Sequence, residues 1–307
     1  FLIISSLITF LLIVNSNINR PDAGLYHLPY VSTLNENKIL IGLSNIHSRF
    51  AHISIMQYLS AINNNYLFLN NGISIPLASV VSFFYIYFFF DAWSIIKNNK
   101  YLDISKIFSL FVLIYIAFKI TRYSSFGNDA VSHLSYFYLI SCVLKDNLKK
   151  INNNKILLIS VFIFINKPML GVVFLFPFVI FLIQNKINFP KILEQVFSLP
   201  ILFLGLWLIK NILISGCIIF PIKSLCIEKL LWTNIHQVEV SQTEGEAWSK
   251  AWPDRLNKKI SMKEFNKDFN WVKAWKVKHM KYMLNILIPY IVILICIVIF
   301  FNIKKKK

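Results

Sequence analysis

Asp22 and His27 are the residues whose types and position most suggest chemistry. They lie in the segment 19–30, directly after the first apolar run, so a carboxylate and an imidazole stand where the chain has just left a membrane. A carboxylate held at such a surface can act as a general base or bind a polar head group. We therefore predict that Asp22 is catalytic and that Tyr26 and His27 contact a substrate. The alternative is a solvated aspartate and an interfacial histidine.

The segment 42–50 adds a cationic group on the same predicted side of the membrane. It carries His47 and Arg49 on a predicted short surface helix. The arginine guanidinium presents a planar fork of donors that fits a phosphate. We predict that Asp22 and Arg49 flank a phosphorylated lipid and that His47 binds substrate beside them.

The segment 124–133 supplies a second acidic group. Asp129 and His133 are four residues apart, so they share one face of a helix. We predict that both face the substrate. The alternative for Asp129 is a first-turn acid that only stabilises the positive N-terminus of its helix.

Two lysines complete the set of candidate substrate-binding residues. Lys210 lies inside the apolar run 197–219, where a charged residue usually faces a cavity or pairs with a partner. The alternative is that its ammonium group reaches back to the membrane surface. Lys167 stands between two apolar runs and is predicted to reach the same surface as Asp22. His236, Glu239, Glu244 and Glu246 match no zinc-ligand spacing.

The elements that must position these residues are membrane helices. The chain has 307 residues, is 56% hydrophobic and has a mean hydropathy of +0.59, which is more apolar surface than a soluble domain needs. The net charge of +18 would suggest nucleic acid in a soluble protein. Here the lysines cluster in short loops and at 304–307, which fits positive charge retained in the cytoplasm. We therefore predict an all-α polytopic bundle in a membrane, with membrane lipids and no nucleic acid as partners.

About eight spans are predicted. Their ranges are 1–14, 73–96, 104–121, 130–144, 156–165, 169–184, 197–219 and 283–303. The first run would rise only about 21 Å as a helix, against roughly 30 Å of hydrocarbon. We interpret it as a truncated span, with a cleaved signal peptide as the alternative. The Lys-rich short loops predict a cytoplasmic C-terminus. The polar stretches 15–71 and 220–282 then form one active-site face of a single domain, 1–307.

The run 156–184 leaves two topologies open. It is either a hairpin of two short helices that meet at Asn166-Lys167-Pro168, or one tilted span kinked at Pro168. The hairpin is favoured, because the single span would put the terminal lysine run outside the cell.

The second polar stretch holds two further features. Residues 262–281 show helical periodicity, with Phe265, Phe269, Val272 and Trp275 on one side, which is typical of a helix lying in the membrane interface. Residues 232–255 combine tryptophans, carboxylates and amides, which suits sugar contact but equally suits an amphipathic loop resting on the membrane.

The four cysteines, at positions 142, 217, 226 and 296, have no metal-type spacing. Cys217 and Cys226 could share one membrane face and form a disulfide. The alternative is that all four are ordinary small apolar residues in or near membrane helices.

The order of these parts resembles the GT-C superfamily of membrane glycosyltransferases. The resemblance rests on an aspartate in the first outer loop, surface helices after it, many spans and a late outer loop. More closely, four segments look like a poorly characterised bacterial branch of GT-C-like membrane proteins, and the similarity covers most of the chain. These segments are Asp22–Pro29, Gly42–Phe50, Lys210-Asn with Ser215-Gly216 and Phe220-Pro221, and Trp248–Arg255.

The resemblance implies transfer of a sugar, with inversion, from a polyprenyl-phosphate donor to an envelope glycan or lipid acceptor at the outer membrane face. In that scheme Asp22 deprotonates the acceptor hydroxyl, and Arg49, Lys167 and Lys210 are candidates for neutralising the departing lipid phosphate. This chain has one aspartate, not an acidic pair, at the first-loop position, so we predict no metal, and no cofactor besides the lipid-linked sugar that serves as donor substrate. Two alternatives stay open: a transporter or flippase for a lipid-linked glycan, and a polysaccharide polymerase or ligase.

Overall fold

The computed structural model describes residues 2–15, 21–37, 40–52, 54–97, 103–185, 190, 198–252, 261–267 and 269–306. Every regular element within these ranges is helical, which confirms the predicted all-α class. The chain divides into two compact units, Phe1–Ile214 and Ser215–Lys307.

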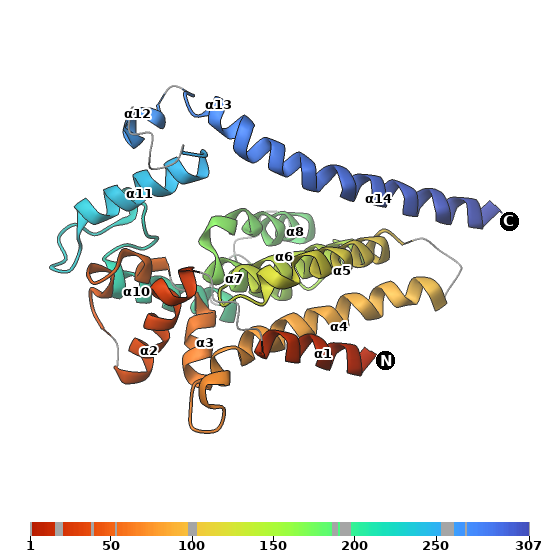
Figure 1. Ribbon diagram of the computed structural model, residues 1–307, viewed down its shortest axis with the longest axis horizontal. Helices are drawn as coiled ribbons and strands as arrows, with labels where there is room; N and C mark the ends of the chain where they lie inside the picture. The colour runs from red at the N-terminus through yellow and green to blue at the C-terminus, as the bar shows by residue number, and fades with distance from the viewer. Residues whose placement is uncertain are drawn as a thin grey trace. The chain divides into compact units, whose positions relative to one another are not determined.

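Seven apolar helices form the frame of the first unit as the structure describes it (Figure 1). These are α1 (Leu2–Val14), α4 (Ile75–Lys97), α5 (Ile104–Tyr123), α6 (Asp129–Lys145), α7 (Asn153–Asn166), α8 (Leu175–Asn185) and α10 (Leu199–Ser215). Helix α1 packs on α4, α4 on α5 and α6, and α6 on α7. Short elements connect them: η1 (Ala23–His27), α2 (Leu28–Glu36), η2 (Leu43–Asn45), η3 (Ser48–His52), α3 (Ile55–Asn63), η4 (Leu69–Ile73) and η5 (Pro168–Phe174).

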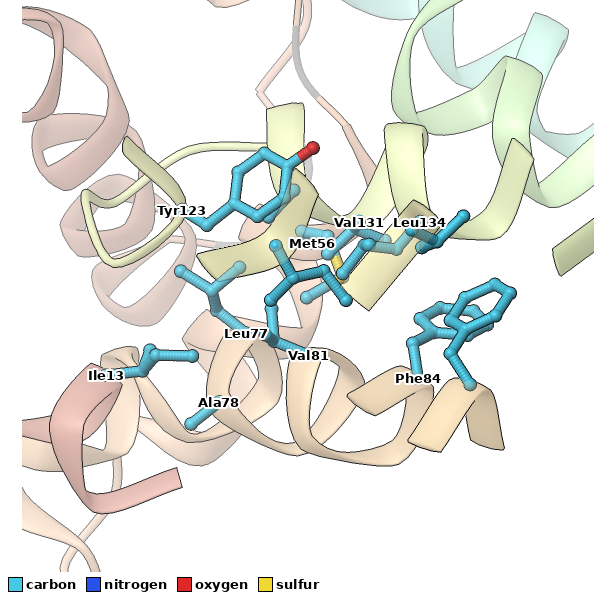
Figure 2. Close-up of a cluster of buried hydrophobic side chains, with 13 residues drawn as sticks. Ile13, Met56, Leu77, Ala78, Val81, Phe84, Tyr123, Val131 and Leu134 are labelled. Carbon is cyan, nitrogen blue, oxygen red and sulfur yellow. The ribbon is translucent and has the colours of Figure 1, made fainter. Parts of the chain in front are cut away.

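The core of this unit lies among α1, α3, α4, α5 and α6. Figure 2 shows Ile13, Met56, Leu77 and Val131, from four of these helices, pointing toward one another. Close packing of such side chains fixes the spacing of the helices. The ends of the helices, and the polar residues on them, are positioned by this packing.

The predicted hairpin at 156–184 is confirmed. Helix α7 ends at Asn166, the backbone leaves helical geometry at Lys167, and α8 packs back against α7. Near the end of α8, the side-chain amide of Gln184 donates to the backbone oxygens of Leu148 and Ile151, just before α7 begins, at 2.9 and 2.8 Å. Lys167 is therefore at a turn, at the same end of the helices as the start of α6.

Two helices of the described ranges are long and apolar enough to cross a membrane alone: Ile75–Ser94 and Ile104–Tyr123. Four apolar helices are shorter, namely Ile3–Val14, Asn153–Asn166, Pro168–Gln184 and Leu199–Ser215. The helix positions follow the predicted runs closely, but the helix lengths support two spans, and the expected eight remain a prediction.

The second unit begins with a disulfide between Cys217 and Cys226. Cys142 is buried and Cys296 exposed, and both are free, so the prediction that all four cysteines are ordinary apolar residues was wrong for the bonded pair. Gly216 precedes the loop with a φ of +75°, and a Cβ built there would lie 1.8 Å from Oγ1 of Thr233. Glycine is therefore required for the chain to close this loop.

The unit continues through η6 (Lys223–Leu225), α11 (Ile235–Ser249), α12 (Met262–Phe265), α13 (Val272–Trp275), η7 (Lys276–Met280) and α14 (Lys281–Lys306). The predicted single interfacial helix over 262–281 was wrong. Phe269 has a φ of +57°, which is incompatible with a continuing right-handed helix. Phe265 is buried against the Trp252 ring, 4.8 Å between centroids, so packing inside the unit ends α12 there. The same contact buries Trp252, which is therefore unavailable for stacking on a sugar.

Candidate functional site

Side chains from four separate segments of the first unit come together where α5 ends and α6 begins. We call this group the Asp129 cluster. Its members are Asp22, Tyr26, His27, His47, Arg49, Arg122, Asp129, His133 and Lys167. The charges of Asp22, Arg49, Asp129 and Arg122 all act on the Tyr26 hydroxyl, although these residues are spread over about a third of the chain. Of the nine predicted site residues, all but Lys210 belong to it.

Asp129 lies at the centre of this cluster and holds two cations. Its Oδ2 accepts from Nη2 of Arg122 at 2.8 Å, and its Oδ1 accepts from Nζ of Lys167 at 2.7 Å. Burial raises the pKa of Asp129, but the two charged hydrogen bonds outweigh that effect and hold the pKa well below its usual range. Asp129 is thus ionised, and both of its oxygens already accept from cations. Beside it, Nδ1 of His133 lies 3.3 Å from the Tyr123 hydroxyl.

His27 is buried and its protonation is fixed by a neighbour. Its Nδ1 lies 2.5 Å from Nε2 of Gln57 on α3. The other end of that amide, Oε1, accepts from the backbone N–H and the hydroxyl of Ser54, so Nε2 must be the donor. His27 therefore accepts at Nδ1 and carries its proton on Nε2. Burial lowers the pKa of His27 to about 4, against the opposing charges of Asp22 and Asp129, so the ring is neutral at physiological pH.

The proton-bearing side of His27 faces the α5–α6 connection. The Phe126 ring lies 5.8 Å from the imidazole, between centroids, and a Cβ built on Gly127 would lie 3.8 Å from Nε2 of His27. A Cβ at that distance would be in ordinary van der Waals contact with the imidazole. Nε2 of His27, a neutral donor, therefore lies next to the Gly127 backbone.

Tyr26 and Arg49 form the other side of the cluster. The Arg49 guanidinium carbon lies 5.7 Å from the centre of the Tyr26 ring, within cation–π range, and the His47 ring stacks on the same tyrosine at 6.5 Å. The backbone N–H of Arg49 donates to Nδ1 of His47 at 3.1 Å, which closes the short turn between them. These contacts hold the guanidinium over an aromatic face and leave its donors available to an anion.

Asp22 precedes η1 and is exposed. It forms no hydrogen bond or ion pair with the described part of the chain, yet its charge acts on both Tyr26 and His27. It differs in this from Asp129, whose two oxygens are both paired. Asp22 is the carboxylate of this cluster with free acceptor atoms.

Lys210 is placed elsewhere. Its Nζ lies 3.3 Å from the centre of the Trp207 ring and 5.9 Å from that of Tyr58, and it lines a separate cavity between α2, α3 and α10. The structure therefore brings Asp22, Arg49 and Lys167 into one cluster but does not add Lys210 to it.

One comparison with known proteins gives a result. A family model described as "Domain of unknown function (DUF8201)" matches residues 1–307. The chain belongs to the DUF8201 family. No curated protein and no solved structure matches it.

The sequence analysis did not identify Arg122, a member of the Asp129 cluster, or Gln57, which orients His27 of that cluster. Arg122 ends one apolar run, and Asp129 begins the next, seven residues later. This basic–acidic pair across a short turn is the signal that could have predicted the contact. Gln57 carried no such signal, because its role depends on α3 packing near η1. Within the described ranges, no three histidine, cysteine or acidic residues gather as a metal site.

Proposed function

We propose that this DUF8201 protein is a multi-pass membrane glycosyltransferase. It transfers a sugar from a polyprenyl-phosphate donor to an envelope glycan or lipid acceptor at the outer face of the bacterial plasma membrane. The observation that best supports this proposal is that Asp22, a carboxylate without a partner among the described residues, belongs to a cluster with more cationic side chains than acids. Such a site can both accept a proton and neutralise a phosphate.

Exposed apolar faces support more spans than the two full-length helices. Large aliphatic and aromatic side chains lie exposed along α1, α8, α10 and α14, where a soluble protein would place polar groups. Examples are Ile3, Leu7, Leu175, Leu202 and Ile291. Hydrocarbon is the solvent that suits these faces, because each helix satisfies its own backbone hydrogen bonds. The proposed fold is a bundle of about eight spans.

The Cys217–Cys226 disulfide supports the orientation. Disulfides persist in oxidising compartments such as the bacterial periplasm and are rare in the cytosol. The disulfide loop directly follows α10. The last turns of α10 contact residues 40–43, because the backbone N–H of Gly42 donates to the backbone oxygen of Leu213 at 2.8 Å. In this orientation the Asp129 cluster faces the outside and the C-terminus the cytoplasm.

Asp22 is the best base because the other candidates are already engaged. Both oxygens of Asp129 are paired, and its depressed pKa makes it a weak proton acceptor. His27 accepts from Gln57 at Nδ1 and carries a proton at Nε2, so it donates toward the site. An acceptor hydroxyl at the cluster would therefore lose its proton to Asp22 as the sugar carbon is attacked.

The cations serve the leaving group. When the glycosidic carbon–oxygen bond breaks, the lipid phosphate departs with its negative charge. The guanidinium of Arg49 forms no hydrogen bond or ion pair within the described part of the chain, and Arg122 and Lys167 together carry more charge than Asp129 neutralises. Preorganised cations of this kind stabilise charge that develops in a transition state.

The test is sugar incorporation in membrane vesicles supplied with a radiolabelled lipid-linked sugar. Asp22→Asn should abolish incorporation, whereas Asp146→Asn, which removes an exposed carboxylate at the opposite end of α6, should leave it unchanged. Translocation of the labelled lipid is followed in the same vesicles. Unchanged incorporation by Asp22→Asn rejects the base, and loss of translocation instead of incorporation identifies a flippase.

A further inference from the structure

The surface of the cavity that contains Lys210 is mostly apolar, and Tyr30, Tyr58, Thr33 and Asn37 line it beside the aliphatic side chains. It has a volume of about 500 Å³ and lies among α2, α3, α10 and the residues Asn37, Leu40 and Leu43. Leu34, Leu40, Leu206 and Leu213 are typical of its walls. Among the described residues that line it, Lys210 is the charged one.

Two donors at or beside this cavity, Nζ of Lys210 and Nε1 of Trp207, have no acceptor among the described residues. Lys210 forms none of the ion pairs among the described residues, and its ammonium group is held between the Trp207 and Tyr58 rings. Nε1 of the adjacent Trp207 is buried and also has no hydrogen-bond partner. The two nearby hydroxyls, of Tyr30 and Tyr58, form a hydrogen bond with each other, with 2.8 Å between the oxygens. A cation facing apolar walls without an anion is costly, so the site is suited to an anionic ligand.

An exposed apolar stripe on α10 leads to this cation. Leu199, Leu202, Leu206 and Ile209 recur at helical spacing, and each is more than half exposed. From Leu199 to Lys210 the helix rises about 16 Å, roughly half the 30 Å hydrocarbon thickness of a bilayer. The stripe therefore matches the depth of one leaflet, with the ammonium group at its end.

We infer that this cavity and stripe form a binding site for a monoanionic phospholipid of one leaflet. The acyl chain lies along the α10 stripe and the phosphodiester group accepts from Lys210. One lysine balances one negative charge, whereas a phosphomonoester carries about −1.5 to −2 and would leave excess charge among apolar walls. A fatty acid fits less well, because burial raises the pKa of a carboxyl group and favours its neutral form. The site is separate from the Asp129 cluster and does not depend on the proposed reaction.

The experiment is native mass spectrometry of the purified full chain with added lipids. The wild type should retain phosphatidylglycerol at least about tenfold more than zwitterionic phosphatidylcholine. Lys210→Met should lose that preference, and Lys210→Arg should keep it. Lys155→Met is the matched control, since Lys155 also lies over an aromatic ring, that of Tyr138 at 5.6 Å, and it should behave as the wild type.

A second readout guards against a misfolded variant. Phosphatidylglycerol should raise the melting temperature of the wild type and of Lys155→Met but not that of Lys210→Met, whatever its starting value. Equal retention by Lys210→Met and wild type overturns the site. So does preferential retention of oleate, which would assign the cavity to a fatty acid, or of phosphatidylcholine.

Discussion

The side-chain amide of Gln57 lies 2.5 Å from Nδ1 of His27, and this bond sets which nitrogen of the imidazole carries the proton. Because Ser54 donates to the oxygen of the same amide, the orientation of Gln57 is itself fixed. Gln57 on α3 thereby selects the tautomer of the His27 ring in η1, and burial of the ring keeps it neutral.

Stability should fall below pH 6.5 because of His27. Its pKa is about 4 in the folded chain and about 6.5 when exposed, so between these values the unfolded chain binds a proton that the folded chain does not. The free energy of unfolding is therefore highest above pH 6.5. It falls by up to about 3 kcal/mol as the pH is lowered to 4. Melting temperatures measured from pH 8 to 4 should show a shallower slope for His27→Gln. Parallel slopes would mean that His27 protonates freely.

Asp129→Asn should destabilise the first unit by about 1–3 kcal/mol. Both side chains of the Asp129–Lys167 pair are about three-quarters buried. Removing the pair should therefore cost more stability than removing an exposed ion pair and less than removing a fully buried one. The comparison is Glu246→Gln, which removes an exposed i,i+4 partner of Lys250 and should cost no more than about 0.5 kcal/mol. Thermal unfolding in nanodiscs measures both. Equal losses would show that the Asp129 pairs contribute nothing beyond a surface contact.

Gly216→Ala and Gly245→Ala should have opposite effects. A Cβ at Gly216 meets Thr233 at 1.8 Å on a backbone with positive φ, so alanine there should destabilise the second unit by about 2 kcal/mol or more. Gly245 lies inside α11 with nothing within 4 Å, so alanine should stabilise by about 0.5–1 kcal/mol. Protease resistance of the disulfide loop, with and without reductant, reports the first effect. A Gly216→Ala protein as resistant as the wild type would contradict it.

The orientation of the bundle predicts two labelling patterns. In a background without Cys142 and Cys296, Tyr66→Cys should react with a membrane-impermeant maleimide in intact cells, because Tyr66 is exposed at the cluster end of the helices. Asn147→Cys, in the exposed turn after α6, should react only after permeabilisation. The reverse pattern would place the cluster in the cytoplasm.

Local periodicity explains what could be predicted of the fold. Apolar runs located the long helices within a few residues, and charged residues at the ends of those runs pointed to Asp22, Asp129 and Lys167. Gln57 could not be predicted, since its partner His27 is thirty residues away and meets it only through packing. The break after Phe265 likewise depends on Trp252, a tertiary contact that outweighed a regular helical pattern.

The steady-state kinetics of Asp22→Asn test the central claim most directly. If Asp22 is the base, kcat for sugar transfer should fall by about 10²–10⁴-fold, while KM for the lipid-linked donor stays within about threefold of the wild type. Asp22→Glu, which keeps a carboxylate, should recover part of the rate. A kcat equal to that of the wild type, or a change confined to KM, would contradict the assignment of Asp22 as the catalytic base.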